Sequence, residues 1–177
     1  MFRFKNGQSI VNVAGVRFGG QPGSLPTVLC GTIFYQGHRI VEDDEKGRFD
    51  RSAAERLVLR QSELSGETGC PFVPHIYART ASALLRYLDF IEEIWSGPFI
   101  VDSAEKSTRS AALSLLSELG YADRAIFNSI SIATDEAEAR ALLENEVDSA
   151  IILAYNPGEP GVRSEEHTSE LQSQNAI

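Results

Sequence analysis

The sequence is poor in cysteine, and this shortage excludes several kinds of site. Its 177 residues include two cysteines, Cys30 and Cys70, which form no CxxC pair and have no partner ligands at metal-binding spacing. A disulfide framework needs more cysteines, and a structural zinc site needs more Cys or His ligands at suitable spacing. We therefore expect two reduced thiols and no bound metal.

Positive charge is also sparse, and it is scattered. The chain has 16 Lys and Arg against 25 Asp and Glu, which gives a formal net charge of −9. Nucleic-acid binding needs clustered Lys and Arg to meet the phosphates. We therefore expect no nucleic-acid partner.

Long apolar runs are missing as well. No run reaches the roughly 20 residues that span a bilayer, and the first residues lack the basic-then-apolar pattern of a signal peptide. These absences predict a cytoplasmic chain without direct membrane insertion. Peripheral docking on a membrane complex through partner subunits stays open.

From Thr27 onward the chain alternates apolar runs with helical stripes of apolar residues, which predicts strands and helices in turn. Asp50, Thr80 and Thr134 are expected to cap helices, and Gly120 is expected to end one. The expected strands are 27–35, 72–77, 99–102, 125–128 and 150–154, and the expected helices are 52–68, 80–94, 107–119 and 135–145.

This alternation with short links predicts an α/β fold with parallel strands and helices outside. A doubly wound sheet and a barrel both fit the rhythm, but the GxGxxG signature of a dinucleotide-binding sheet is missing after the first strand. A TIM (β/α)8 barrel needs eight strands over about 250 residues. We expect residues 27–162 to form the N-terminal part of such a barrel, with about five βα units.

Residues 1–26 are expected to form a small β-hairpin that lies across the bottom of the barrel. The dipeptide Asn6-Gly7 favours a tight turn between strands at 2–5 and 10–13. The segment 16–18 could continue this hairpin before the glycine cluster at 19–23 breaks the pattern.

Residues 163–177 interrupt the rhythm where a helix should follow. The string RSEEHTSELQS at 163–173 resembles the in-frame translation of a sequencing-library adapter, so we expect a non-native tail; a genuine polar tail is the alternative. If the natural frame is cut near Gly161, this chain should be inactive and should self-associate through its open strand edges.

Chemistry in a barrel lies at the carboxyl ends of the strands, and two polar residues stand there directly after apolar runs. Asp102 follows the third strand and Asn128 the fourth. A carboxylate in this position is costly unless hydrogen-bond donors meet it. Helix capping by Asp102 and a turn role for Asn128 are the alternatives.

Four segments closely resemble the H subunits of tetrahydromethanopterin S-methyltransferases, up to about residue 160. They are VAGVRFGGQPG at 13–23, GTIFYQGHRIVED at 31–43, RAIFNSI at 124–130 and IILAYNP at 151–157. The first two are long enough to be specific. The chain departs from the family pattern at 74–77, which leaves the contribution of the second strand open.

The resemblance implies a pterin-binding TIM barrel. Its methyltransferase activity would move a methyl group from N5-methyl-tetrahydropterin to the cob(I)amide of a partner corrinoid protein. Asp102 would accept the two parallel N–H donors of the pterin edge. The implied pterin-binding residues are Asp102, Asn128, Ser129 and Asn156, and the possible site-lining residues are Tyr35, His38 and His75.

The implied mechanism is a nucleophilic displacement in which cobalt attacks the methyl carbon while the pterin nitrogen leaves. An amine leaves poorly unless it is protonated or hydrogen-bonded. Asn128 would be the catalytic residue that stabilises this nitrogen. The family also implies other methyltransferase subunits as partners and a homo-oligomer for the full-length protein.

Two alternatives remain open. One is a tetrahydrofolate-dependent corrinoid methyltransferase of bacterial methylamine, betaine or methoxy-compound demethylation. The other is a non-catalytic docking subunit of a corrinoid complex, which would bind its partner without binding pterin.

Overall fold

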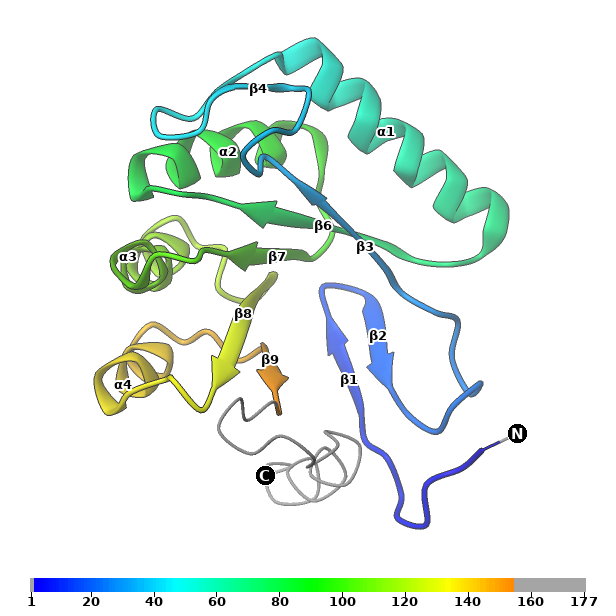
Figure 1. Ribbon diagram of the computed structural model, residues 1–177. Coiled ribbons are helices and arrows are strands. Elements are labelled where there is room, and N and C mark those ends of the chain that lie inside the picture. Colours follow the sequence, from blue (N-terminus) through cyan, green and yellow to red (C-terminus); the bar gives the residue numbers. More distant parts are fainter. Residues whose placement is uncertain (1, 155–177) are drawn as a thin grey trace.

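A five-stranded parallel sheet organises the chain in the computed structural model, which describes residues 2–154 (Figure 1). Its strands, in spatial order, are β3 (Leu29–Ile33), β6 (Phe72–Tyr77), β7 (Phe99–Asp102), β8 (Ala125–Ser131) and β9 (Ala150–Leu153). The helices that connect them are α1 (Arg51–Thr68), α2 (Ala81–Ile94), α3 (Lys106–Glu118) and α4 (Glu136–Glu144). The α/β class and all nine expected elements of the repeat are confirmed.

The helix ends follow the expected capping chemistry with one exception. Asp50 accepts a hydrogen bond from the Ala53 amide at 2.9 Å, and Thr80 accepts one from the Ala83 amide at 3.1 Å. The expectation that Thr134 caps α4 is wrong. Asp135 caps it, because the Thr134 hydroxyl already accepts from the Ser131 amide at 2.9 Å.

All four described helices cover the same face of the sheet. The main hydrophobic cluster contains residues of α1 to α4 together with the sheet residues that point toward them, such as Ile76, Val101 and Phe127. A second cluster on the opposite face contains no helix residue. Its core is formed by Val13, Val73, Ile100 and Ile126.

The residues of this second cluster come from the sheet and from an N-terminal hairpin of β1 (Ile10–Val13) and β2 (Val16–Gly19). Val13 is 4% exposed because it packs on the first inward residues of β6, β7 and β8. The hairpin therefore covers the amino ends of these strands, opposite the helices (Figure 1).

The expected turn of this hairpin at Asn6-Gly7 is wrong, and residues 2–5 form no strand. The turn is Ala14-Gly15, with φ values of 44° and 90°. Two consecutive positive φ values are those of a type I′ turn, whose twist suits a two-residue hairpin. The Asn12 side chain supports the turn by accepting from the Gly15 amide at 2.9 Å.

The loop between β3 and α1 contains a second, smaller hairpin that the sequence did not predict. It pairs β4 (Val41–Asp43) with β5 (Arg48–Phe49) in antiparallel fashion. Such short strands with charged residues show no clear alternation of apolar and polar positions. Asp43 closes the hairpin by accepting from the Lys46 amide and the Arg48 side chain.

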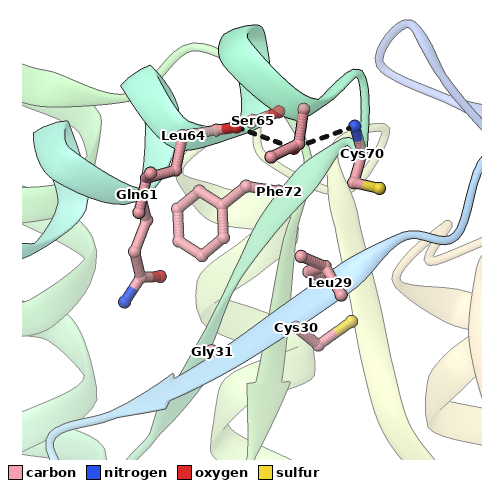
Figure 2. Close-up of a pocket in the computed structure, with 9 residues that line it drawn as sticks. Leu29, Cys30, Gly31, Gln61, Leu64, Ser65, Cys70 and Phe72 are labelled. Atoms are coloured by element: carbon pink, nitrogen blue, oxygen red, sulfur yellow. Dashed lines mark hydrogen bonds between the residues drawn. The ribbon is translucent and has the colours of Figure 1, made fainter.

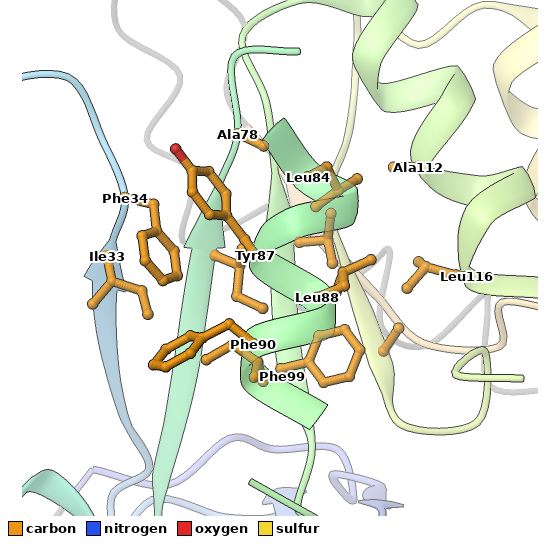
Figure 3. Packing of buried hydrophobic residues seen from close by; sticks show 14 of the residues in the cluster. Ile33, Phe34, Ala78, Leu84, Tyr87, Leu88, Phe90, Phe99, Ala112 and Leu116 are labelled. Atoms are coloured by element: carbon orange, nitrogen blue, oxygen red, sulfur yellow. The ribbon is translucent and has the colours of Figure 1, made fainter. Parts of the chain in front are cut away.

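An aromatic stack joins the end of β3 to α2 in the main core (Figure 3). The rings of Phe34 and Tyr87 lie 4.1 Å apart at an interplanar angle of 4°. Phe34 has a φ of 67°, which departs from the strand geometry of its neighbour Ile33. This change of direction lets both residues enter the same core instead of opposite faces of the sheet.

The two edge strands of the sheet expose apolar side chains. Leu29 on β3 is 53% exposed, and Leu153 on β9 is 51% exposed. None of the helices in residues 2–154 combines the length and apolar character needed to cross a membrane. The tail at 163–177 lies outside the described residues.

Tyr87 offers a test of this core, because its buried hydroxyl has no hydrogen-bond partner within residues 2–154. Burial, with the nearby carboxylates of Asp44 and Asp43, raises the pKa of Tyr87 to about 12. The unfolded chain, with an ordinary tyrosine pKa near 10, loses its proton first as the pH rises. The free energy of unfolding should therefore fall between pH 10 and 12.

Tyr87→Phe should leave the stability at pH 7 unchanged or slightly higher, because no hydrogen bond is lost. It should also remove part of the fall above pH 10. Urea unfolding of both proteins at pH 7, 10 and 11.5 measures this difference, and Tyr121→Phe controls for a less buried phenol. A loss of more than about 1 kcal/mol at pH 7 would show that the hydroxyl has a partner.

Candidate functional site

Strand alternation places several polar side chains on the face opposite the helices. Each follows an apolar residue of the second cluster by two positions, so both point to the same face. Those on β7 and β8 form the next layer toward the carboxyl ends of the strands, whereas the one on β6 lies level with Ile100. These residues are His75 on β6, Asp102 on β7 and Asn128 on β8.

The strands are staggered, so these side chains do not form a single row. Asp102 lies opposite Asn128 on one side and opposite Tyr77 on the other. His75 lies opposite Thr32 of β3 and is two residues nearer the amino ends of the strands than Asp102. His75 consequently reaches diagonally toward the polar side chains of β7 and β8.

Three contacts join four neighbouring strands around the imidazole of His75. Its Nδ1 lies 2.8 Å from the Thr32 hydroxyl, and its Nε2 lies 3.2 Å from Asp102 Oδ2. Asn128 Nδ2 lies 3.4 Å from the same Nε2. The side chains of His75 and Asp102 are 16% and 26% exposed, so the cluster is half-buried and accessible to a ligand.

The structure therefore brings together three of the expected site residues, namely Asp102, Asn128 and His75. Thr32 was not among the site residues expected from the sequence. A signal for it existed, since Thr32 occupies the inward position nearest the carboxyl end of β3.

Ser129 directly follows Asn128, at an irregularity in the ladder between β8 and β9. The register shifts between Asn128 and Ile130, so Ser129 has no direct partner on β9. Bulges of this kind often redirect side chains next to functional sites. Asn156 lies outside the described residues.

Tyr35 and His38 form a separate aromatic pair in the loop after β3. Their ring centroids lie 4.8 Å apart, and Tyr35 is 42% exposed. Burial lowers the pKa of His38, so its imidazole favours the neutral form. Within residues 2–154, neither side chain makes a hydrogen bond to the cluster around His75.

Comparison with known families identifies the chain. The profile of the family described as tetrahydromethanopterin S-methyltransferase MtrH subunit matches residues 6–174. The chain belongs to this family.

Curated relatives agree with this assignment. The chain is 51% identical over 156 residues to the H subunit of the mtx methyltransferase of Methanosarcina mazei, which covers 88% of this chain and 50% of that protein. It is 44% identical over 162 residues to the H subunit of the tetrahydromethanopterin S-methyltransferase of Methanococcus aeolicus, covering 92% of this chain and 51% of the relative. The chain thus spans about half the length of the curated relatives that it matches, and the expected resemblance is confirmed.

An open hollow elsewhere on this MtrH-family chain borders the edge strand β3 and helix α1 (Figure 2). Its lining includes Leu29, Leu64 and Phe72 together with both cysteines. Partial burial raises the pKa of the Cys30 thiol, which favours its protonated form. Among the residues that the structure describes, no three potential metal ligands gather here or elsewhere. The polar side chains that line the hollow, Gln61, Ser65 and Thr68, are all uncharged.

A buried ion pair supports the loop that follows Asp102 at the end of β7. Arg109 Nε on α3 donates to Glu138 Oε1 on α4 at 2.7 Å. The same guanidinium donates from Nη1 to the carbonyl oxygens of Ser103 and Ala104, at 3.3 Å each. The Glu138 side chain is 1% exposed. The pair therefore ties the loop after β7 to both neighbouring helices.

Glu138→Ala should lower the free energy of unfolding by about 3–5 kcal/mol, because it leaves the Arg109 charge half-buried without its partner. Glu136→Ala is the matched control on the same helix. Its side chain is 91% exposed and pairs with Arg140, so its loss should cost less than about 1 kcal/mol. Chemical denaturation of the two variants tests this contrast, and equal losses would contradict the structural role of Glu138.

Proposed function

We propose that the full-length protein transfers a methyl group from N5-methyl-tetrahydromethanopterin to the cob(I)amide of a partner corrinoid protein. The observation that carries this proposal is the placement of Asp102 and Asn128 directly opposite each other on β7 and β8, in a chain of the MtrH family. Relatives from methanogens carry tetrahydromethanopterin in their names, which favours it over tetrahydrofolate as the pterin.

The sheet is proposed to be part of a TIM barrel. The five strands follow one another in sequence order, and the described helices share one face. A doubly wound sheet reverses its order and carries helices on both faces. The exposed apolar residues on edge strands β3 and β9 would be covered by further strands and helices of the full-length protein. The hairpin at the amino ends would close the bottom of this barrel.

Asp102 and Asn128 have complementary roles in this proposal. A carboxylate offers about four lone-pair sites, and His75 uses one of them on Oδ2. The others can accept the amino group and the ring N–H of a pterin together. The Asn128 amide would lie beside the pterin nitrogen that carries the methyl group, with Ser129 next to it.

In the transfer itself, the cob(I)amide of the partner would supply the nucleophile that accepts the methyl group. The electron pair of the broken carbon–N5 bond would remain on N5, which would take up a proton from solvent. Hydrogen bonding by Asn128 would stabilise the charge that develops on this nitrogen. Asp102 would hold the ring so that the methyl group faces the incoming cobalt.

The proposed partners are the corrinoid protein and other subunits of a methyltransferase complex. We further propose that the protein meets a membrane only through such subunits. A homo-oligomer of the full-length protein stays a prediction.

Asp102→Asn in the full-length protein should weaken methyl-tetrahydromethanopterin binding about 10- to 100-fold, the loss expected for hydrogen bonds to a charged group. Asn128→Ala should lower kcat about 100-fold with a smaller change in KM. Calorimetry and methyl transfer to cob(I)amide measure the two effects. Asp123→Asn is the control, since this exposed aspartate precedes β8 at the opposite end of the strand.

If both variants bound the pterin and transferred the methyl group as well as the wild type, the site assignment would be rejected. Tighter binding of methyl-tetrahydrofolate than of methyl-tetrahydromethanopterin by the wild type would reject the proposed donor. Retained binding of the corrinoid protein without pterin affinity would indicate a docking role instead.

A further inference from the structure

We propose that His75 is a positioning residue that sets the hydrogen bonding of both Asp102 and Asn128, with Thr32 anchoring its imidazole ring. This inference rests on the proposed function and deepens it, because it determines which atoms a substrate must present to the site. It rests on the two hydrogen-bond neighbours of a single nitrogen, Nε2 of His75.

Nε2 of His75 has two polar neighbours with opposite demands. Asp102 Oδ2, at 3.2 Å, only accepts hydrogen bonds when the carboxylate is ionised, so it requires a hydrogen on Nε2. Asn128 Nδ2, at 3.4 Å, is a donor and would require a lone pair there. One ring nitrogen cannot satisfy both neighbours at once.

The contact with Asp102 decides between them, since it is the shorter of the two and is assisted by charge. Nε2 therefore carries the hydrogen and donates it to Asp102. Nδ1 of the neutral ring is then an acceptor and takes the hydrogen of the Thr32 hydroxyl at 2.8 Å. A hydroxyl can also accept from Nδ1 if the ring becomes protonated, so Thr32 anchors the ring in either state.

Two consequences follow for a ligand. Asp102 is oriented by His75 and presents its remaining lone pairs to donors. Asn128 receives no acceptor from His75, so its amide N–H groups remain available for an acceptor on the ligand. The site should thus select a ring system with adjacent N–H donors at one position and a ring nitrogen or carbonyl oxygen at the next.

A pair of amide substitutions in the full-length protein separates positioning from mere space filling. His75→Gln can place an N–H near the position of Nε2 and keep the contact with Asp102. His75→Asn places its amide nearer Nδ1 and loses that contact. We expect His75→Gln to bind methyl-tetrahydromethanopterin within about threefold of the wild type, and His75→Asn to bind about 10-fold or more weakly.

The loss in His75→Asn should appear in KM, with kcat changed less than about threefold, because binding groups are displaced. Ile100→Val is the packing control. Ile100 lies opposite His75 in the ladder, so this change should lower the melting temperature without changing affinity. Equal affinities for the Gln and Asn variants would overturn the proposal.

Thr32 is tested by a double-mutant cycle. Thr32→Val keeps the shape of the side chain and removes the hydroxyl, and it should weaken pterin binding about threefold. The same change should have no further effect in the His75→Gln variant, whose side chain no longer depends on Thr32. Additive effects of the two substitutions would contradict the anchoring role.

The tautomer provides a readout that needs no substrate. Nitrogen-15 NMR of the full-length protein, labelled at histidine, should show His75 protonated at Nε2 and unprotonated at Nδ1 near pH 8. Protonation at Nδ1 alone would overturn the proposal whatever the activity. If the Nε2 form is found and the wild type does not bind the pterin, the proposed function fails while the positioning role of His75 stands.

Discussion

The structure depends on the fact that all described helices pack on one face of a parallel sheet. Tyr87, Leu88 and Leu113 fill the space between that face and the helices, so the inward residues of the strands are left to form a separate interior. At the amino ends this interior is closed by the hairpin through Val13. At the carboxyl ends it contains polar groups, and none of the helices in residues 2–154 contributes apolar side chains to this face.

Strand stagger then determines which of these polar groups can meet. The last residues of β6 and β7, Tyr77 and Asp102, lie opposite each other, so His75 lies two residues before the level of Asp102 and Asn128. Because β6 pairs with β7 through His75 and Ile100, the imidazole lies below the other two and reaches both. The same stagger brings Thr32 opposite His75.

Much of the fold could be predicted from the sequence, since buried parallel strands and amphipathic helices carry strong patterns of apolar residues. The ends of β7 and β8 were predictable for the same reason, and so were Asp102 and Asn128. The hairpin turn at Ala14-Gly15 was missed because Asn6-Gly7 has the better local turn chemistry, while packing of Val13 on the sheet decides the outcome. The network of His75 and Thr32 depends on register between strands 43 residues apart in sequence, which local pattern does not determine.

The charge of Asp102 connects this network to the surrounding loop. An ionised carboxylate with 26% exposure needs donors, and one donor from His75 leaves most of its capacity unused. Within residues 2–154, no lysine or arginine forms an ion pair with Asp102, so its remaining lone pairs stay available for hydrogen bonds from a ligand. Arg109 stabilises the loop after Asp102 by donating hydrogen bonds to the carbonyl oxygens of Ser103 and Ala104. The helices thus stabilise the backbone around the site, while the carboxylate of Asp102 keeps free hydrogen-bonding capacity toward the interior. Ligand sites commonly combine a rigid surround with a few such polar groups.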